Sequence, residues 1–349
     1  MKLCLIADAA SPHTRKWVRG CLKPGWEVTV ISHAGGSIPG ARVIVHPLTL
    51  SGFPLHCWSV RRLIRGLNPD IVHAHQLGAH GLYAWFSGCK ILINSAWGSD
   101  VLVNPRRSRF LRQLVRFLIR HSTAITSDSR QVTEELTRLG AGPGQIIPIL
   151  FGLERPVFER LTSFVRPQAP VIICSPRLHE PLYNIPLLLE AFERISREFD
   201  DVWLWICGDG SLTPELTRYV AERGLERVRF WGRVSPEQSL ELLAQSHLLV
   251  SIPSSDGTPV SMLEGMTAGS LPVISDLPVY HDWIEDGVNG LITGFRPEQV
   301  ADALRKGIGD AELRRRAAER NRRLIAERAI WDDQFQAMID FYQKAVESR

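Results

Sequence analysis

The sequence predicts an α/β fold with two domains, each built on a doubly wound parallel sheet. The chain has 349 residues, 44% of them hydrophobic, which is enough for about two domains with separate cores. Short apolar runs alternate with helical patterns in both halves, as they do in parallel-sheet proteins. A proline-punctuated segment over residues 151–170 separates the halves, and we expect it to be the linker.

The apolar runs of the first half have the composition of buried parallel strands. We expect strands at residues 3–7, 28–32, 43–46, 70–73, 90–94 and 125–127, and helices at 61–67 and 106–122. Ser11 followed by Pro12 predicts the start of the first helix, because this pair suits the N-cap and the first helical position.

Polar side chains follow several of these strands. Ligands in doubly wound sheets bind beyond the carboxyl ends of the strands, so we expect these side chains to face one crevice. His13 either contacts a ligand there or bonds locally in its helical turn. We expect His73 to face the core and His75 to reach the crevice, and no third ligand supports a metal pair. Asp100 either orients a ligand or caps the next helix, which is the commoner use.

A basic face is predicted on the helix at 106–122. It is formed by Arg109, Arg112, Arg116 and Arg120. The opposite, apolar face is formed by Phe110, Leu111, Leu114, Val115, Phe117 and Leu118. Such a helix either lies on an anionic membrane or packs its apolar face on the sheet and leaves its arginines in water. The solvated arrangement is the commoner of the two.

The second half repeats the alternation of strands and helices. We expect strands at 170–174, 202–207, 229–232 and 248–252, and helices at 187–192, from Pro214 onward and over 311–349. Gly208, Asp209 and Gly210 follow one of these strands. Glycines at that place let the backbone approach a ligand, and they also suit an ordinary strand-to-helix turn.

Charge and cysteine usage set limits on the function. The formal net charge of +4 is a mild excess that gives no argument for nucleic-acid binding. The six cysteines have no metal-like spacing, so we expect free thiols and a reducing compartment. The apolar run at 3–7 is too short for a signal peptide or a membrane span. We therefore expect a cytoplasmic protein, at the inner face of the membrane if the basic helix contacts lipid.

The stretch from Ser254 to Met266 carries the clearest chemical signal. Gly257 permits a turn after the strand at 248–252, and Thr258 with Pro259 predicts a helix start. A helix start attracts phosphate through its unbonded N–H groups and its dipole.

Two acidic residues, Asp256 in the loop and Glu264 inside the helix, flank this helix start. Carboxylates in those places accept hydrogen bonds from hydroxyl groups beside a phosphate. A phosphate with hydroxyls on both sides describes a nucleotide-diphosphate sugar. On spacing alone, an ordinary helix cap with two unrelated acids is the commoner arrangement.

Residues 253–290 resemble the donor-binding signature of glycosyltransferase family four, the retaining group 1 enzymes with the GT-B fold. The matching pieces are Asp256, Glu264, Ala268-Gly269, Pro272-Val273 and residues 287–291. Asp256 stands where the family usually has Glu, which keeps the charge and shortens the reach. The resemblance implies two Rossmann-like domains that face a central cleft.

The resemblance also assigns roles in donor binding and catalysis. Asp256 and Arg177 would be the catalytic residues, Asp256 by holding sugar hydroxyls and Arg177 by contacting the diphosphate, and Glu264 would hold the ribose. Without the resemblance, Arg177 would be taken as an ordinary surface arginine at the end of a strand. The diphosphate would also lie against Gly257, Thr258, Pro259 and Val260. The remaining donor contacts would come from Gly208, Asp209 and Trp231, the last beside the base.

Domain roles follow from the same resemblance. Residues 1–155, completed by a helix at 331–349, would bind the acceptor through His13, His75 and Asp100. Residues 165–330 would bind the donor. The implied reaction moves a sugar from a UDP- or GDP-sugar to a hydroxyl of a glycan or lipid-linked acceptor, with retention and without a metal or other cofactor. Cell-envelope or exopolysaccharide synthesis is the implied setting.

Two departures from the family keep alternatives open. Tyr183 stands in the place of a family Lys, and Trp97 in the place of a family His. A non-catalytic subunit that binds nucleotide sugars is therefore one alternative. A non-hydrolysing nucleotide-sugar epimerase, which shares the fold, is another.

Overall fold

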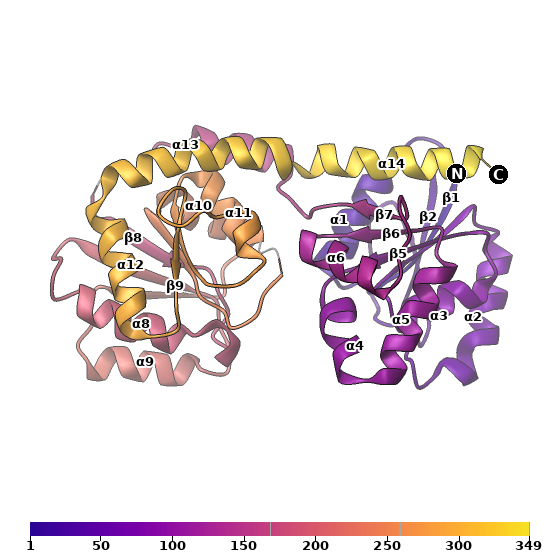
Figure 1. The fold of residues 1–349 in the computed structure, drawn as a ribbon, viewed down its shortest axis with the longest axis horizontal. Coiled ribbons are helices and arrows are strands. Elements are labelled where there is room, and N and C mark those ends of the chain that lie inside the picture. The colour runs from indigo at the N-terminus through magenta and orange to yellow at the C-terminus, as the bar shows by residue number, and fades with distance from the viewer. Residues whose placement is uncertain (168, 258–259, 349) are drawn as a thin grey trace. The chain divides into compact units, whose positions relative to one another are not determined.

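The computed structural model describes residues 1–167, 169–257 and 260–348. Its contacts divide the chain into two compact units (Figure 1). One unit contains Met1–Leu150 and Asp332–Arg349, and the other contains Phe151–Trp331. Each unit holds one sheet in which every strand pair is parallel, as the sequence predicts.

The sheet of the first unit has seven strands in the order β3-β2-β1-β4-β5-β6-β7. Their bounds are β1 Lys2–Ile6, β2 Glu27–Ser32, β3 Arg42–Val45, β4 Ile71–His75, β5 Ile91–Ala96, β6 Ala124–Ser127 and β7 Ile146–Pro148. The central strands are buried along nearly their whole length, as expected of a sheet covered on both faces. The strand order reverses between β1 and β4.

Helices surround this sheet, and their bounds differ in places from the predicted ones. They are α1 Pro12–Cys21, α2 Phe53–Leu67, α3 Ala79–Ser87, the π-helical turn η1 Ser99–Val103, α4 Asn104–Arg107, α5 Arg109–His121, α6 Arg130–Leu139 and α14 Trp331–Glu347. The predicted helix at 106–122 is interrupted at Ser108, whose hydroxyl accepts a hydrogen bond from Leu111 N at 3.4 Å. This capping bond starts α5 as a separate helix.

The last helix, α14, completes the first unit. Trp17 Nε1 donates a hydrogen bond to the Tyr342 hydroxyl at 3.1 Å, and that hydroxyl also lies 2.5 Å from His73 Nδ1. Gly20 of α1 leaves room for Phe335, because a Cβ atom on Gly20 would lie 2.2 Å from the ring. The C-terminal segment is thus part of the N-terminal unit's core.

The sheet of the second unit has six strands in the order β10-β9-β8-β11-β12-β13. Their bounds are β8 Val171–Ser175, β9 Val202–Cys207, β10 Val228–Gly232, β11 Leu248–Ser251, β12 Leu271–Ser275 and β13 Leu291–Thr293. The order reverses between β8 and β11. The helical elements are α7 Arg155–Ser163, η2 Pro181–Tyr183, α8 Ile185–Ile195, α9 Thr213–Glu222, α10 Pro236–Gln245, α11 Val260–Ala268, η3 Tyr280–Asp282, α12 Pro297–Gly309 and α13 Ala311–Arg328.

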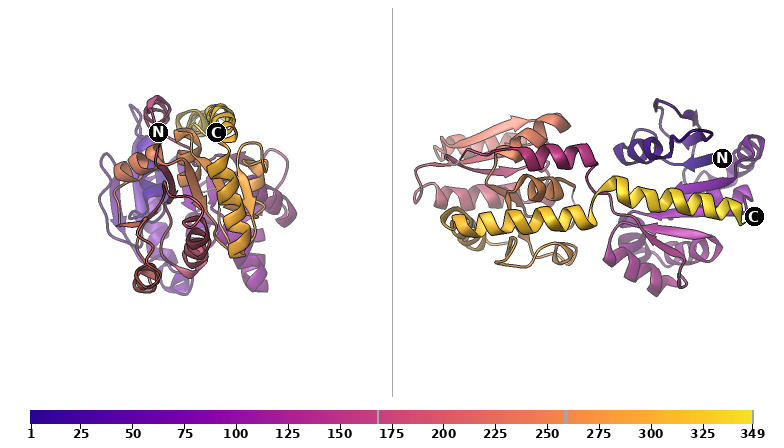
Figure 2. Two further views of the ribbon diagram at one scale, coloured as in Figure 1. Left: turned by 90° about the vertical axis from the view of Figure 1, so that its left-hand side faces the viewer. Right: turned by 90° about the horizontal axis from the view of Figure 1, so that it is seen from above.

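Helices cover both faces of this second sheet (Figures 1 and 2). α8 packs beside α12 on one face, and α11 packs beside α7, α10 and α13 on the other. Large apolar side chains such as Phe192, Leu204 and Leu304 form the core between α8, α12 and the strands. This two-sided covering is the doubly wound arrangement that the alternation of elements predicts.

The prediction of a linker at 151–170 is wrong. That segment contains α7, and Pro156 lies in its first helical turn, where proline is tolerated. Residues 311–347 are helical, as predicted, and form two helices, α13 and α14, the second of which begins at Trp331. The break lies at Ala329 and Ile330, where Leu153 N donates to Ala329 O at 2.8 Å and residue 153 forms a β-bridge with residue 330.

Candidate functional site

The candidate site lies where the strand order of the second sheet reverses. Arg177 follows β8 and Asp256 follows β11, and these two strands are neighbours in the sheet. Ligands of doubly wound sheets bind at such a switch point, beyond the carboxyl ends of the strands. The structure therefore brings together two residues that lie 79 positions apart and that the sequence predicts to be catalytic.

Arg177 and Asp256 form an ion pair. The Arg177 Nη2 group donates to Asp256 Oδ2, and Arg177 Nε donates to the Ser251 hydroxyl at 2.7 Å. The two side chains are only 11% and 17% exposed, so the pair is largely shielded from water. The ring of Tyr183 covers the guanidinium, with its centroid 5.3 Å from Arg177 Cζ. The sequence predicts separate ligand contacts for these two charges, whereas the structure pairs them with each other.

Tyr280 of η3 is a site residue that the sequence analysis missed. Its hydroxyl donates to Asp256 Oδ2 at 2.8 Å and lies 3.3 Å from Arg177 Nη2. The side chain is fully buried, and burial raises the pKa of the phenol, so the proton needed for this bond is present at neutral pH. The available signal was topological, since Tyr280 follows β12, the neighbour of β11.

The turn after β9 supports the Arg177 loop from one side. Gly208 has a φ of +96°, and a Cβ there would lie 2.7 Å from Arg177 O. Glycine is therefore required for this close approach. Asp209 Oδ1 accepts hydrogen bonds from Gly210 N at 2.8 Å and from Thr213 Oγ1 at 2.9 Å, and these bonds lower its pKa. Oδ1 of Asp209 thus stabilises its own turn, and the contact of Asp209 with a ligand stays a prediction.

Trp231 ends the edge strand beside this turn. Gly208 N donates to Gly232 O at 2.7 Å, which links the loop of β9 to the end of β10. The Trp231 ring carries the Arg229 guanidinium on one face, 3.8 Å from its centroid, and meets Trp205 edge-on at 5.3 Å. Only part of this half-buried ring remains accessible to a base.

The predicted phosphate-binding helix is α11, described from Val260 onward. Thr258 and Pro259, its predicted cap and first residue, lie outside the described residues. Gly257 N donates to Asp256 Oδ1 at 2.9 Å, which fixes the loop before the helix. Glu264 is half-buried one turn into the helix.

Two arginines occupy the opposite end of α11. Arg166 donates to the carbonyls of Ala268 and Gly269 at 2.9 and 3.1 Å, and Arg322 donates to that of Thr267 at 3.0 Å. These bonds satisfy the carbonyl end of the helix. The N-terminal end follows β11 and so belongs to the sheet edge that carries Arg177.

The switch point of the first sheet is buried and aromatic. His13 is exposed after β1, with its ring 5.4 Å from that of Trp97. His75, at the end of β4, is only 2% exposed, with Trp97 at 4.8 Å and Trp17 at 5.3 Å between ring centroids. Burial holds the pKa of His75 far below its usual value. The prediction that His75 reaches an open crevice is wrong, because these indole rings enclose it.

His73 faces the core, as predicted, and bonds to the Ser95 hydroxyl at 2.8 Å through Nε2. Asp100 is buried and joins two strand-end loops. Its carboxylate accepts from Leu77 N at 2.8 Å and from Trp97 N at 3.0 Å. Asp100 lies inside η1, whose N-cap is Gly98, so its expected role as a helix cap is wrong. Its contact with a ligand stays a prediction.

Asp128, beyond the end of β6, is a second carboxyl that the sequence analysis missed. Burial raises the pKa of Asp100 to about 6, and burial together with the nearby Asp100 charge raises that of Asp128 to about 6. Both groups thus bind a proton more tightly than ordinary aspartates.

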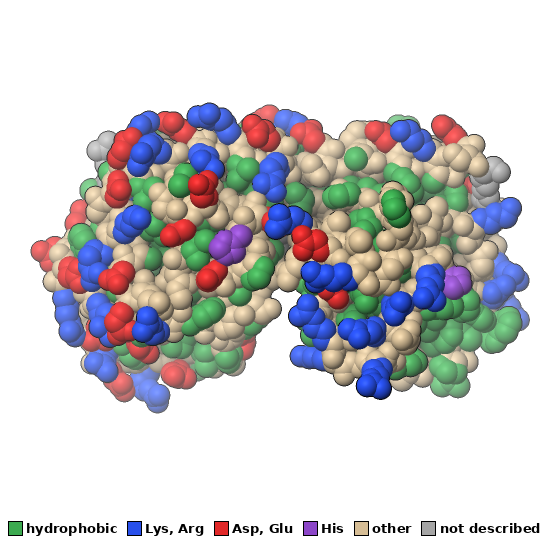
Figure 3. Space-filling view, viewed as in Figure 1, with side chains coloured by type: hydrophobic (Ala, Val, Ile, Leu, Met, Phe, Trp, Pro, Cys, Tyr) green, Lys and Arg blue, Asp and Glu red, His purple; other side chains and the backbone are tan. Residues whose placement is uncertain are grey.

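The predicted basic face of α5 is present. Arg109, Arg112 and Arg120 are exposed, and Arg116 is half-buried. Phe110, predicted on the packed apolar side, is instead 66% exposed. On α2, Leu55 and Trp58 are 81% and 69% exposed. Figure 3 shows basic atoms over α4 and α5 and hydrophobic atoms beside them.

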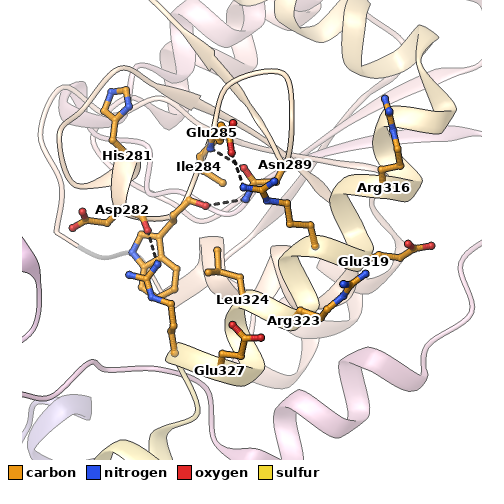
Figure 4. A pocket seen from close by; sticks show the side chains of 13 residues that line it. His281, Asp282, Ile284, Glu285, Asn289, Arg316, Glu319, Arg323, Leu324 and Glu327 are labelled. Carbon is orange, nitrogen blue, oxygen red and sulfur yellow. Dashed lines mark hydrogen bonds and ion pairs between the residues drawn. The ribbon is translucent and has the colours of Figure 1, made fainter.

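A surface pocket of about 680 Å³ lies elsewhere in the second unit, between residues 281–289 and α13 (Figure 4). None of the predicted site residues lines it. Some of the charged side chains that line it form ion pairs, for example Arg320 with Glu285 at 2.5 Å.

Among the described residues, no cluster of three His, Cys, Asp or Glu side chains is placed to hold a metal ion. Within the same residues, no helix has the length and apolar character that crossing a bilayer requires.

Comparison with known families identifies two matching regions. The model described as "Glycosyl transferases group 1" matches residues 160–324, and that described as "Glycosyl transferase 4-like" matches residues 2–129. Together they cover most of both units.

Individual relatives are distant. An alpha-D-kanosaminyltransferase of Streptomyces kanamyceticus is 25% identical over 276 residues, which are 71% of this chain and 70% of the relative. A phosphatidyl-myo-inositol mannosyltransferase of Mycobacterium tuberculosis is 28% identical over 152 residues, 43% of this chain and 39% of the relative. The crystal structure of Anabaena Alr3699/HepE in complex with UDP superposes with a TM-score of 0.80 and 16% identity, covering 99% of this chain and 100% of that one.

Proposed function

The chain belongs to the group 1 glycosyltransferases with the GT-B fold, and on that premise we propose that it uses a nucleotide-diphosphate sugar of UDP or GDP. The sugar passes to a hydroxyl group with retention at the anomeric carbon. The observation that carries this proposal is the Arg177–Asp256 pair at the switch point of the second sheet. A cation and a hydrogen-bond acceptor for hydroxyls are the two groups that a sugar diphosphate requires there.

Arg177 and the start of α11 stabilise the leaving diphosphate in this proposal. Nε and Nη2 of Arg177 are engaged, whereas Nη1 has no hydrogen-bond partner among the residues that the structure describes. The two N–H groups of Nη1 point to a role as phosphate donors. Negative charge grows on the leaving group as the bond to the sugar breaks, so fixed donors act most strongly in the transition state. We assign the acceptor proton to the departing phosphate, without a metal ion.

Asp256 and Glu264 bind hydroxyl groups on the two sides of that diphosphate. Asp256 has an oxygen, Oδ1, with one short bond to Gly257 N, which leaves acceptor capacity for a sugar hydroxyl. Glu264, inside α11, is assigned to the ribose. A carboxylate that accepts a hydroxyl hydrogen bond contributes on the order of 1.5–3 kcal/mol to binding.

We assign the acceptor to the first unit and to the class of glycans or lipid-linked glycans. Relatives include a GDP-mannose:cellobiosyl-diphosphopolyprenol alpha-mannosyltransferase of Xanthomonas campestris, 28% identical over 26% of this chain, whose name describes a lipid-linked acceptor. The exposed arginines of α5, together with Phe110 and Trp58, suit contact with an anionic bilayer. We therefore propose a role in cell-envelope or exopolysaccharide synthesis at the inner membrane face.

The experiment that tests the function measures nucleotide release from a panel of UDP- and GDP-sugars, with and without candidate acceptors. We expect nucleotide release that depends on an acceptor, and a product with the anomeric configuration of the donor by NMR. Conversion of the donor to a different sugar without an acceptor would identify an epimerase. Nucleotide binding without turnover across the panel would identify a binding subunit.

A further inference from the structure

The Arg177–Asp256 pair is bridged by one buried hydroxyl group. The Tyr280 hydroxyl donates to Asp256 Oδ2 at 2.8 Å and accepts from Arg177 Nη2 at 3.3 Å. It also lies 3.5 Å from the Ser251 hydroxyl, which holds Arg177 Nε. A single side chain from the β12 end of the sheet thus contacts both charges and the group that orients one of them.

The remaining geometry leaves one edge of the guanidinium for a ligand. Nε of Arg177 donates to Ser251, Nη2 donates to Asp256 and Tyr280, and the Tyr183 ring covers one face of the guanidinium. Among the residues that the structure describes, Nη1 has no hydrogen-bond partner. Because the guanidinium is planar and its donors are fixed in a fork, holding Nε and Nη2 also fixes the direction of the Nη1 donors.

Hydrogen bonds within residues 280–289 and to α13 restrain the segment that carries Tyr280. Ile284 N donates to Tyr280 O at 2.8 Å, and Asn289 donates to Trp283 O at 2.9 Å and accepts from Glu285 N at 2.7 Å. Asn289 also bonds the buried Asn321 of α13 at 2.8 Å, so the whole segment is tied to that helix. Figure 4 shows Asn289 between residues 281–285 and α13. A buried side chain on a tied segment has little freedom to turn away.

We propose that Tyr280 is a positioning residue that holds the Asp256–Arg177 pair so that Nη1 of Arg177 faces the diphosphate of the donor. This inference rests on the proposed function, because it assigns Arg177 to a diphosphate. Tyr280 does not touch the substrate. Its hydroxyl acts through Asp256 and Arg177, and its loss leaves Nη2 with one fewer partner and Oδ2 with one fewer donor.

The test compares the wild-type protein with Tyr280→Phe, which keeps the buried ring and removes only the hydroxyl. Isothermal titration calorimetry with UDP, UMP, GDP and GMP measures how much the second phosphate contributes to binding. We expect the preference for the diphosphate over the monophosphate to fall about tenfold in Tyr280→Phe. A role limited to folding would weaken both nucleotides alike and leave that preference unchanged.

Tyr219→Phe is the matched control. Tyr219 belongs to the same unit, and its hydroxyl donates to Glu193 Oε2 at 2.8 Å on the outside of α8. The Tyr219→Phe variant therefore loses a hydrogen bond between a tyrosine and a carboxylate, as Tyr280→Phe does, but away from the site. We expect its diphosphate preference and turnover to equal those of the wild type.

A double-mutant cycle with Asp256→Asn tests whether Tyr280 acts through the pair. Turnover is followed as nucleotide release from UDP-glucose and GDP-mannose. We expect Tyr280→Phe to lower kcat/KM about tenfold in the wild type and less than about twofold in the Asp256→Asn background, since coupled residues are not additive. Equal losses in both backgrounds would overturn the role of Tyr280 and leave the function intact. Failure of the wild type to bind either diphosphate would instead overturn the proposed function and this inference with it.

Discussion

The two switch points of this chain use opposite kinds of chemistry on the same topology. In the second unit, Arg177 and Asp256 place two opposite charges beyond β8 and β11. In the first unit, β4 ends at His75, which packs against the uncharged rings of Trp17 and Trp97. The sheets are built alike, so the difference comes from the side chains that follow equivalent strands.

The two switch points differ in how the loss of hydration on burial is compensated. In an arginine–aspartate pair, the attraction between the two charges offsets part of the hydration that each loses on burial. An imidazole without such a partner loses its proton instead, as the depressed pKa of His75 indicates.

The largest test of this contrast removes the cation from the second switch point. Arg177→Ala is expected to lower kcat for sugar transfer about 100-fold, or ~3 kcal/mol, because a fixed donor to the leaving group is lost. Initial rates of nucleotide release measure the change. Arg194→Ala is the control, since Arg194 also pairs with a carboxylate, Glu298 at 2.6 Å, on the surface of the same unit. Equal rates in wild type and Arg177→Ala would remove the basis for the contrast.

A second test addresses the carboxylate inside α11. Glu264→Ala is expected to weaken UDP or GDP binding by ~2 kcal/mol, about 30-fold, because a charged acceptor for the ribose is lost. Titration calorimetry measures the affinity, and circular dichroism checks the fold. Glu237→Ala, at an exposed position on α10, is the control and should leave the nucleotide affinity unchanged. Undiminished affinity in a well-folded Glu264→Ala protein would contradict the ribose assignment.

A third test concerns Asp100 and Asp128, the two carboxyls of the first unit whose pKa values are raised. The pKa of Asp100 and that of Asp128 are each about 6 in the folded chain, above the ordinary value, so the folded state binds more protons. The free energy of unfolding therefore falls as the pH rises from about 4 to about 6 and then levels off. Asp128→Asn should flatten this slope and raise the free energy of unfolding at pH 7 by roughly 1–2 kcal/mol.

Urea unfolding at pH 4.5 and pH 7, followed by tryptophan fluorescence, measures this difference. Asp340→Asn, at an exposed position of α14, is the control and should keep the wild-type slope. A slope that Asp128→Asn leaves intact would show that Asp128 is not among the groups responsible.

The smallest effect is expected at the basic face of α5. Arg112→Ala should weaken binding to vesicles that contain anionic lipid about fivefold, or ~1 kcal/mol, and high salt should abolish the difference. Vesicle sedimentation with and without phosphatidylglycerol measures it. Arg138→Ala on α6, where the arginine pairs with Glu135 at 3.3 Å, is the control. Equal sedimentation with neutral and anionic vesicles would reject the membrane contact.

Local signals predicted several elements well. The strand at 202–207 has the predicted bounds, and Pro12 opens α1 as the Ser-Pro pair indicates. Proline misled the interpretation at 151–170, because punctuation by proline is shared by linkers and by first helical turns such as that of α7. The short strands β7 and β13, of three residues each, gave no detectable pattern.

The sequence by itself determined the α/β alternation, the loop and acids around Gly257, and the presence of Arg177 after a strand. These features depend on neighbours within a few positions, where hydrophobic period and turn chemistry act. Only the tertiary structure decided that Arg177 pairs with Asp256, that Tyr280 bridges them, and that His75 is enclosed. Those contacts depend on which strands become neighbours in the sheet and on how deeply each side chain is buried, and neither is encoded in local spacing.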